Sequence, residues 1–316
     1  MSARPTSFPT LPSLRAGGKR ALAHALALIE TARGSEELAA LLDTAAADPK
    51  AHVAGLTGPP GVGKSTLTNA LIRDWRGKSE TVGVVAVDPS SRATGGALLG
   101  DRARMQTDPG DKGVYVRSMA ARDRLGGLSD DTVAAVALMR AIFDRVLVES
   151  VGIGQSEADI SFAADTVILC VQPGSGDSLQ FMKAGVMELP DIVVVTKADM
   201  GHAAKRARSE VEGALTLFNR EDEWSVPVVL VSAPTGAGLD DLHKALAAHR
   251  EHLGATRLAA RRRAQEKTWV AESIRARFGA EGLKTAGKLE VSGGPFGRER
   301  EIARRLLAAL RGAGDA

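Results

Sequence analysis

The sequence predicts an α/β protein in which a mostly parallel central sheet is covered by helices on both faces. Seven short runs rich in Val, Ile and Leu alternate with longer helical segments between residues 51 and 250. Runs that are apolar throughout are typical of parallel strands buried on both sides. We expect the strands at Val53–Thr57, Val82–Val87, Val114–Arg117, Val146–Glu149, Val167–Val171, Ile192–Thr196 and Val228–Val231.

A glycine-rich loop follows the first expected strand. Residues 58–65 read Gly-Pro-Pro-Gly-Val-Gly-Lys-Ser, and a helical segment begins at Thr66. The glycines allow backbone N–H groups to surround phosphate oxygens, and Lys64 adds a positive charge near the β and γ phosphates. The Ser65 hydroxyl is a ligand for Mg²⁺. An ordinary glycine turn is the alternative, which the flanking strand and helix disfavour. The sequence therefore predicts a P-loop NTPase domain.

The chain divides into three expected parts. They are an N-terminal helical extension at 1–50, the P-loop domain at 51–253 and a C-terminal helical arm at 254–316. In the arm, Val270, Ile274 and Phe278 recur every four residues, a stripe that fits either a core or an interface. A Gly-Gly-Pro break at 293–295 precedes a final short helix, Glu299–Leu310.

The composition is that of a globular protein, with 316 residues and a net charge of +3. No apolar run approaches the roughly twenty residues that a membrane span needs, and the first residues lack the order of a signal peptide. Cys170 is the single cysteine, which excludes an intrachain disulfide and fits a reducing cytoplasm. Its position within an apolar strand indicates a small core residue. We expect a cytoplasmic protein that does not contact a membrane.

The arm is the basic part of the chain. Residues 254–316 hold 14 Lys and Arg against 7 Asp and Glu. The cluster Arg261–Arg263 lies in a helical segment, and no aromatic stacking platform accompanies it. We interpret the cluster as a solvated helix face or a protein interface, and we expect no nucleic-acid partner.

Two carboxylates follow expected strands on the side where the phosphate loop lies. Asp88 follows the second strand, and Glu149 follows the apolar run Val146-Leu147-Val148 of the fourth. Parallel sheets bind ligands at the carboxyl ends of their strands, and a carboxylate there can hold Mg²⁺ or its waters. Gly152 can then offer its N–H to the γ-phosphate. Asp101, in a glycine-rich stretch, is equally a metal-side candidate or a helix N-cap.

The ends of the sixth and seventh strands predict which base is bound. Thr196-Lys197-Ala198-Asp199 follows the sixth strand, and a carboxylate at Asp199 can accept hydrogen bonds from guanine N1–H and its exocyclic amine. Adenine lacks this donor pair, so a buried Asp199 would reject ATP. The Lys197 stem can lie over the base plane. The turn Ser232-Ala233-Pro234 can contact guanine O6 through its backbone. The expected ligand is GTP.

These residues resemble the P-loop GTPases that serve adenosylcobalamin-dependent acyl-CoA mutases, the MeaB/ArgK/MMAA group. The resemblance is densest over Gly55–Asp199 and looser through Ser232 into the arm. Its most specific stretches are Glu149-x-x-Gly152, with Glu where most GTPases carry Asp, and the run Val151–Glu157. The other matching stretches are 60–66, 86–91, Thr94-Gly95-Gly96, Leu99-Gly100-Asp101 and 173–177 with Leu179, Gln180 and Lys183.

The resemblance implies a homodimeric, Mg²⁺-dependent GTPase. A B12-dependent acyl-CoA mutase, similar to methylmalonyl-CoA mutase, would read its nucleotide state, which gates adenosylcobalamin loading, protection or reactivation. The magnesium-side residues that match are Ser65, Asp88, Asp101 and Glu149. The stretch 174–183 matches a switch segment through which the mutase stimulates hydrolysis. The switch residues implied there are Gly174, Asp177, Gln180 and Lys183.

Together, the residues and the resemblance predict one hydrolytic site. The expected catalytic residues are Lys64, Asp88, Glu149 and Lys183. The expected nucleotide contacts are Gly58, Pro59, Pro60, Gly61, Val62, Gly63, Lys64, Ser65, Thr66, Gly152, Thr196, Lys197, Asp199, Ser232, Ala233 and Pro234. We expect in-line attack of water on the γ-phosphate, with Lys64 and Mg²⁺ offsetting the developing charge. Turnover without the partner should be slow, and Gln155 is a candidate for orienting the water.

Thr196 departs from the family pattern, which usually has Asn at the start of the base-reading motif. Asn tethers the phosphate loop and touches the base, so its loss should weaken nucleotide binding. Two other classes use the same loop. A metal-delivery GTPase would need Cys pairs or a His-rich stretch, whereas this chain has one cysteine and six scattered histidines. A P-loop kinase would need a second acceptor pocket and would not use a guanine motif.

Overall fold

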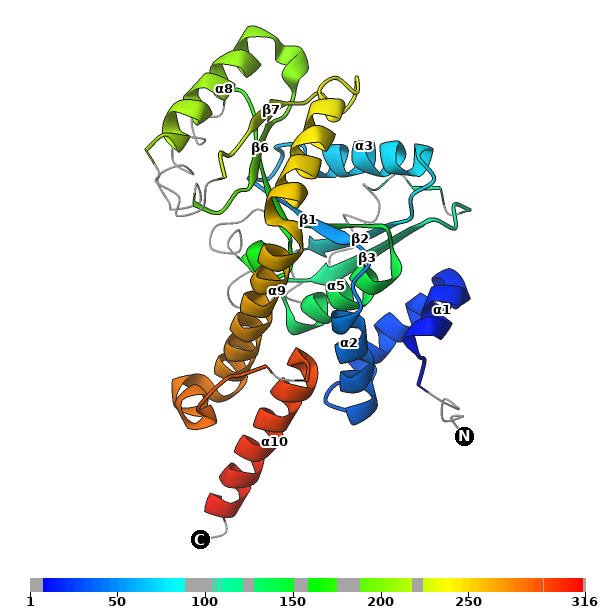
Figure 1. Cartoon of the computed structure of the whole chain (residues 1–316), viewed down its shortest axis with the longest axis vertical. Coiled ribbons are helices and arrows are strands. Elements are labelled where there is room, and N and C mark those ends of the chain that lie inside the picture. The colour runs from blue at the N-terminus through cyan, green and yellow to red at the C-terminus, as the bar shows by residue number, and fades with distance from the viewer. Residues whose placement is uncertain are drawn as a thin grey trace.

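A seven-stranded parallel sheet forms the centre of the molecule (Figure 1). The computed structural model describes residues 8–88, 105, 107–108, 110–121, 128–150, 159–174, 188–217, 224–291 and 293–314, with the backbone alone at 88 and 312–314. The strand order is β3-β2-β4-β1-β5-β6-β7, and every neighbouring pair is parallel. The strands are β1 His52–Thr57, β2 Val82–Asp88, β3 Val114–Ala120, β4 Arg145–Glu149, β5 Thr166–Val171, β6 Ile192–Val195 and β7 Val228–Leu230. All seven expected strands and the fold class are confirmed.

The helices begin where local capping residues predict. The Ser35 and Ser129 hydroxyls accept the N–H groups of the third residue beyond them, which fixes the first turns of α2 and α5. The final helix is longer than expected, because Asp43 of α2 accepts the N–H groups of Phe296 and Gly297 and caps it at Pro295. The helices are α1 Leu11–Thr31, α2 Glu36–Ala47, α3 Lys64–Gly77, α5 Asp130–Ile142, α8 His202–Leu215, α9 Leu239–Ala286 and α10 Pro295–Gly314, with short 3₁₀ turns η1 Ile160–Phe162 and η3 Ala198–Met200.

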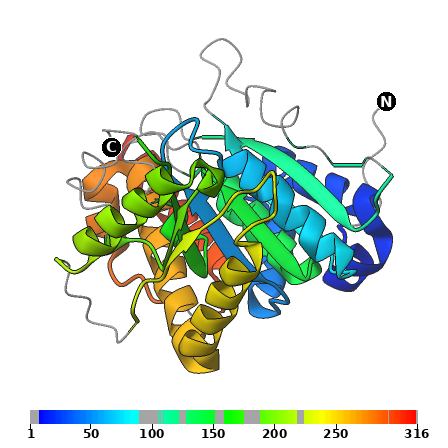
Figure 2. The same ribbon diagram turned by 90° about the horizontal axis from the view of Figure 1, so that it is seen from above.

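Helices cover both faces of the sheet (Figure 2). Alternate residues of each strand belong to different core layers on these two faces. Leu56 of β1 packs in the layer with Leu67 of α3 and Leu242 of α9. Val53 of β1 packs in the opposite layer with residues of α1, α2, α5 and α10. A third cluster joins β5, β6 and β7 to α8. The sheet is therefore covered on both faces, as its apolar strands predict, and Cys170 is a buried core residue.

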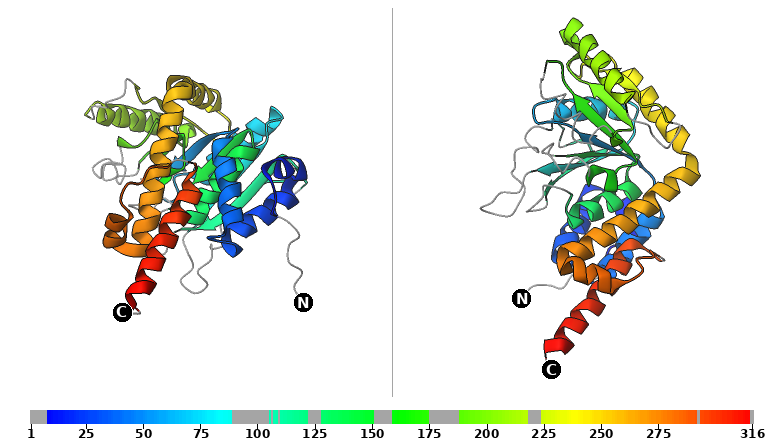
Figure 3. Two further views of the ribbon diagram at one scale, coloured as in Figure 1. Left: turned by 60° about the horizontal axis from the view of Figure 1, so that its bottom comes forward. Right: turned by 90° about the vertical axis from the view of Figure 1, so that its left-hand side faces the viewer.

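Helix α9 contributes to both layers because it bends at Gly254, which has φ 52° (Figure 3). Leu246, before the bend, packs with α3, whereas Val270 and Ile274, after it, pack in the opposite layer. The arm stripe of Val270, Ile274 and Phe278 thus belongs to the core, with Phe278 only partly buried. Trp269 beside it lies against the ring of Phe296 in α10. The bend falls where the sequence predicts the arm to begin. The division into three domains stays a prediction.

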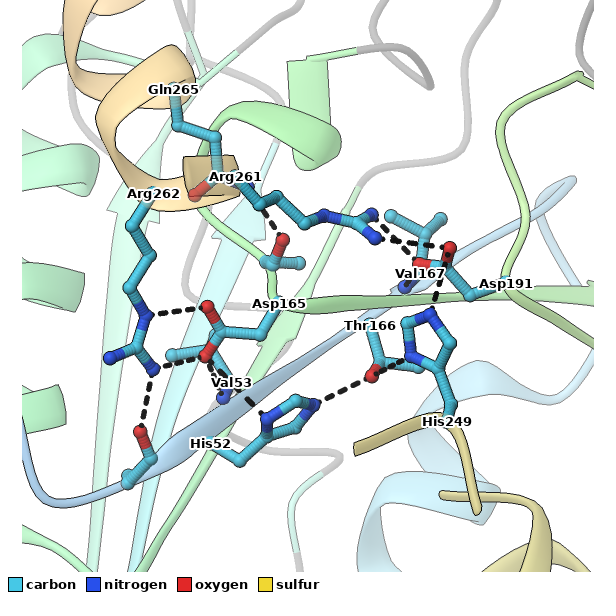
Figure 4. A network of polar contacts seen from close by, with 12 residues as sticks. His52, Val53, Asp165, Thr166, Val167, Asp191, His249, Arg261, Arg262 and Gln265 are labelled. Atoms are coloured by element: carbon cyan, nitrogen blue, oxygen red, sulfur yellow. Dashed lines mark hydrogen bonds and ion pairs between the residues drawn. The ribbon is translucent and has the colours of Figure 1, made fainter. Parts of the chain in front are cut away.

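Two arginines of α9 bind the amino-terminal edge of the sheet (Figure 4). Arg261 pairs with Asp191 at 2.8 Å, and Arg262 pairs with Asp165 at 2.6 Å. Both aspartates are buried, immediately before β6 and β5. The prediction that the cluster Arg261–Arg263 is a solvated face or a protein interface is therefore wrong for these two residues. Their charges are neutralised within the chain by aspartates about 70 and 97 residues away in sequence.

A chain of buried polar groups links this edge to the part of α9 before the bend. The Thr166 hydroxyl lies 2.7 Å from both His52 Nε2 and His249 Nδ1, and His249 Nε2 lies 3.3 Å from Asp191. Burial lowers the pKa of His52 to about 4, so this imidazole is neutral at pH 7. Both halves of α9 thus contact the same edge of the sheet.

The helices in the described part of the chain include none with the length and apolar character that a membrane span requires.

Candidate functional site

The phosphate loop connects β1 to the first turn of α3 at the carboxyl edge of the sheet. Gly63 precedes the helix with φ 103°, a left-handed conformation that favours glycine. The first turn of a helix directs its N–H groups and the positive end of the helix dipole toward such a loop, an arrangement that favours anions. Lys64 is 7% exposed, and its Nζ donates to the carbonyls of Gly58 and Pro59 at 2.7 and 3.1 Å. The loop is therefore held in shape by the lysine that is expected to meet the phosphates.

The loop lies directly against the end of β5. A Cβ at Gly58 would come within 2.2 Å of the Cys170 carbonyl oxygen, so this position requires glycine. On the other side of the loop, a Cβ at Gly63 would stand 3.9 Å from that of Thr196. The glycines thus allow close backbone packing as well as access for a ligand.

Two predicted metal-side residues are brought together at this edge. The Ser65 hydroxyl donates to Glu149 Oε1 at 2.6 Å, and the Thr68 hydroxyl donates to Oε2 at 2.9 Å. Glu149 ends β4, which lies beside β1, and is 3% exposed. The Ser65 oxygen keeps its lone pairs free while its proton is directed to the carboxylate. Hydroxyl and carboxylate oxygens are the ligands that Mg²⁺ prefers, so this pair fits a magnesium ion.

Asp88 ends β2, on the other side of β4. Ala86, two residues earlier in β2, is in register with Glu149, which places the Asp88 backbone at the same edge. Gly174, a predicted switch residue, has φ 76° in the turn after β5. Within the described residues, no group of three or more His, Cys, Asp or Glu side chains gathers to hold a metal. The remaining predicted site groups lie outside the described part of the chain: the Asp88 side chain, Asp101, Gly152, Gln155, Asp177, Gln180 and Lys183.

The predicted base-reading residues lie together beyond the ends of β6 and β7. The buried Ser232 hydroxyl donates to Asp199 Oδ1 at 2.7 Å and fixes the carboxylate, which is itself exposed. Lys197 has φ 54°, and its Nζ lies 2.5 Å from Gln172 Oε1 and 3.5 Å from the Gly61 carbonyl. The expectation that a buried Asp199 rejects ATP is therefore not met in this structure, where the carboxylate is exposed, oriented and open to a ligand. Lys197 spans the gap to the phosphate loop.

Thr196 makes the tether that its replacement of Asn was expected to remove. Its hydroxyl lies 2.7 Å from the Val62 carbonyl in the phosphate loop and 3.0 Å from the Val171 carbonyl at the end of β5. Sequence reasoning also missed two other site residues. Thr68 is three residues after Ser65 in α3, a helical spacing that could have indicated it. No local signal in the sequence points to Gln172.

The fold and this arrangement define a P-loop nucleoside triphosphatase. Phosphate-binding, carboxylate and base-reading groups all meet at the carboxyl edge of one parallel sheet, as expected for nucleotide sites in such folds. The phosphate loop follows the central strand β1, which has β4, β2 and β3 on one side and β5, β6 and β7 on the other.

Comparison with known proteins identifies the family. A family model described as "Methylmalonyl Co-A mutase-associated GTPase MeaB" matches residues 22–284. A putative GTPase of Pyrococcus abyssi is 44% identical over 265 residues, which cover 81% of this chain and 78% of that protein. The mitochondrial methylmalonic aciduria type A homolog of Mus musculus is 37% identical over 221 residues, 68% of this chain and 53% of that protein. The chain belongs to the MeaB family of methylmalonyl-CoA mutase-associated GTPases.

The structural comparison agrees with this assignment. A crystal structure described as an LAO/AO transport system kinase matches with a TM-score of 0.66 and 26% sequence identity, covering 95% of this chain and 96% of that one. The structure of the hydrogenase maturation factor HypB from Archaeoglobus fulgidus matches with a TM-score of 0.50 at 18% identity over 67% of this chain and 97% of that one, which is a likeness of fold alone.

Proposed function

We propose that this GTPase controls the adenosylcobalamin cofactor of an acyl-CoA mutase similar to methylmalonyl-CoA mutase. The nucleotide state would be read by the mutase and would gate loading, protection or reactivation of the cofactor. The family match across residues 22–284 is the observation that carries the proposal. The relative in Mus musculus, named for methylmalonic aciduria, supports the same metabolic setting.

The described residues support in-line hydrolysis of GTP. Lys64 would leave the carbonyls of Gly58 and Pro59 and donate to the β and γ phosphates, so that its charge stabilises the transition state. Ser65 and Glu149 would hold Mg²⁺, together with Asp88 and Asp101. When bound, the magnesium ion supplies charge neutralisation at the phosphates. Asp199 would select guanine through its two donors.

We infer that turnover is slow in the isolated chain. The mutase would contact the switch segment 174–183, which carries Asp177, Gln180 and Lys183, and would complete the catalytic arrangement. This is the usual logic of a GTPase whose partner supplies or orders missing groups.

The proposal predicts that the mutase stimulates hydrolysis. Steady-state release of phosphate from GTP should rise at least about tenfold when the cognate mutase is added, because partner contacts to a catalytic segment commonly contribute more than this. The Lys64→Ala variant should remain inactive with the mutase present, which excludes a contaminating GTPase. Equal rates with and without the mutase would contradict partner control.

The proposal includes a homodimer formed through the arm. The C-terminal end of α10 extends away from the remainder of the chain (Figure 3), and Leu310 near that end is 64% exposed. Sedimentation equilibrium should therefore give twice the chain mass of 33.0 kDa. Leu310→Asp should shift the mass toward the monomer, whereas Leu217→Asp, at a still more exposed leucine (82%) on the P-loop domain, should not. A monomeric wild-type protein at micromolar concentration would refute the dimer.

A further inference from the structure

The Thr196 hydroxyl has two acceptors and a single proton. It lies 2.7 Å from the Val62 carbonyl and 3.0 Å from the Val171 carbonyl, and the residue is 5% exposed. The backbone N–H of Thr196 also donates to the Val171 carbonyl, at 2.8 Å. The residue therefore bridges the phosphate loop and the last residue of β5 through its backbone and its side chain together.

We propose that Thr196 is a positioning residue that holds the phosphate loop and leaves N7 of guanine without a hydrogen-bond donor. Guanine would then be selected through the groups of its Watson–Crick edge, N1–H, the exocyclic amine and O6. The inference rests on the proposed binding of guanine nucleotides, and it deepens that proposal by naming which edge of the base contributes to affinity.

The chemistry of the donors supports this division of roles. Guanine presents only acceptors, N7 and O6, on the side of its imidazole ring. A hydroxyl whose one proton is directed to a buried carbonyl cannot also donate to N7. An Asn side chain at this position would have two N–H donors, one for the loop and one for the base. Thr196 can replace the first of these contacts but not the second.

The neighbouring groups do not compensate on that edge. Asp199 is an acceptor when ionised, so it can bind the N1–H and the exocyclic amine but not N7. The Lys197 ammonium is directed to Gln172 Oε1 and the Gly61 carbonyl, on the phosphate-loop side. Asp199 would therefore accept the guanine N–H groups, whereas the donors of Thr196 and Lys197 are directed to protein acceptors and not toward N7.

Calorimetric titration of the full chain with GDP and with 7-deaza-GDP, which has a C–H in place of N7, tests the base contact. The wild type should bind the two nucleotides within about twofold of each other. In Thr196→Asn, GDP should bind about tenfold more tightly than 7-deaza-GDP, the change expected for one added hydrogen bond. A wild-type preference for GDP of tenfold or more would overturn the inference. Failure of the wild type to bind GDP at all would instead refute the proposed nucleotide function.

The tether is tested without nucleotide. In Thr196→Val, which keeps the shape and removes the hydroxyl, the phosphate-loop amides at 61–63 should exchange hydrogen at least about tenfold faster than in the wild type. Thr196→Ser should restore the slow exchange because it keeps the donor. The strand amides of β5 serve as an internal control for overall stability. Equal exchange in the Val and Ser variants would overturn the positioning role, whether or not GDP binds.

Discussion

Replacing Lys64 by alanine is expected to lower GTP hydrolysis at least a hundredfold, the usual cost of removing one group that stabilises developing charge (about 10²–10³). The side chain is almost fully buried in the loop and its ammonium stands where the phosphates are expected. No other described side chain of the phosphate loop carries a positive charge. Affinity for GTP should fall as well, because the same ammonium binds the ground-state phosphates.

Lys78→Ala is the matched control for this experiment. Lys78 follows the C-terminal end of the same helix, α3, and pairs with Asp74 on the surface at 2.7 Å. It should keep wild-type turnover. Thermal unfolding of Lys64→Ala is needed beside the kinetics, since two loop carbonyls lose their donor. Hydrolysis by a folded Lys64→Ala protein within twofold of the wild type would refute the assigned role.

Asp165→Asn is expected to give the largest loss of stability, about 3–5 kcal/mol, the range for breaking one side of a buried ion pair. Asp165 is fully buried and accepts from Arg262 Nε at 2.8 Å and Nη2 at 2.6 Å, and from the Val53 N–H at 2.8 Å. Burial raises the pKa of Asp165, but the Arg262 guanidinium outweighs this and holds the pKa below its usual range. The substitution leaves the Arg262 charge poorly compensated.

Urea unfolding at pH 7 measures this effect. Arg206→Ala is a suitable control, because Arg206 forms an exposed pair with Glu210 on α8 and should change the free energy of unfolding by less than about 0.5 kcal/mol. A loss below about 1 kcal/mol in Asp165→Asn would mean that the clamp between α9 and the sheet edge contributes little to stability.

The sheet and the phosphate loop could be predicted from the sequence because their signals are local. Each strand is a continuous apolar run, and the loop motif, its strand and its helix are consecutive. The Ser65–Glu149 contact followed from the same logic, since parallel strands end at a common edge. The length of α10 could not be predicted, because its start depends on Asp43, a residue about 253 positions away.

The prediction for the arginine cluster was wrong because it, too, depended on residues distant in the sequence. A run of positive charge on a helix indicates a solvated face when only its neighbours in sequence are considered. Arg261 and Arg262 instead reach buried aspartates in distant loops, because α9 bends at Gly254 and crosses the sheet edge. The tether made by Thr196 could not be predicted either. The sequence indicated only that the Asn side-chain amide is absent, whereas the structure shows the two carbonyls that lie within hydrogen-bond distance of the Thr196 hydroxyl.

Guanine selection by Asp199 is the claim on which the account depends most. The carboxylate is oriented by Ser232 and accepts from two guanine donors in the proposed complex. In Asp199→Asn, the side-chain amide presents one donor and one acceptor. This pattern matches xanthine, which has a carbonyl in place of the exocyclic amine of guanine. Glu210→Gln, an exposed change on α8, is the control.

The most direct measurement is a titration of the wild type and of Asp199→Asn with GDP and xanthosine diphosphate in the presence of Mg²⁺. We expect the wild type to prefer GDP by at least about a hundredfold, because Asp199 would place an acceptor against the extra carbonyl of xanthine, and we expect the variant to reverse the preference. If both proteins bound GDP with the same affinity, and the variant bound xanthosine diphosphate no more tightly than the wild type does, guanine selection by Asp199 would be contradicted.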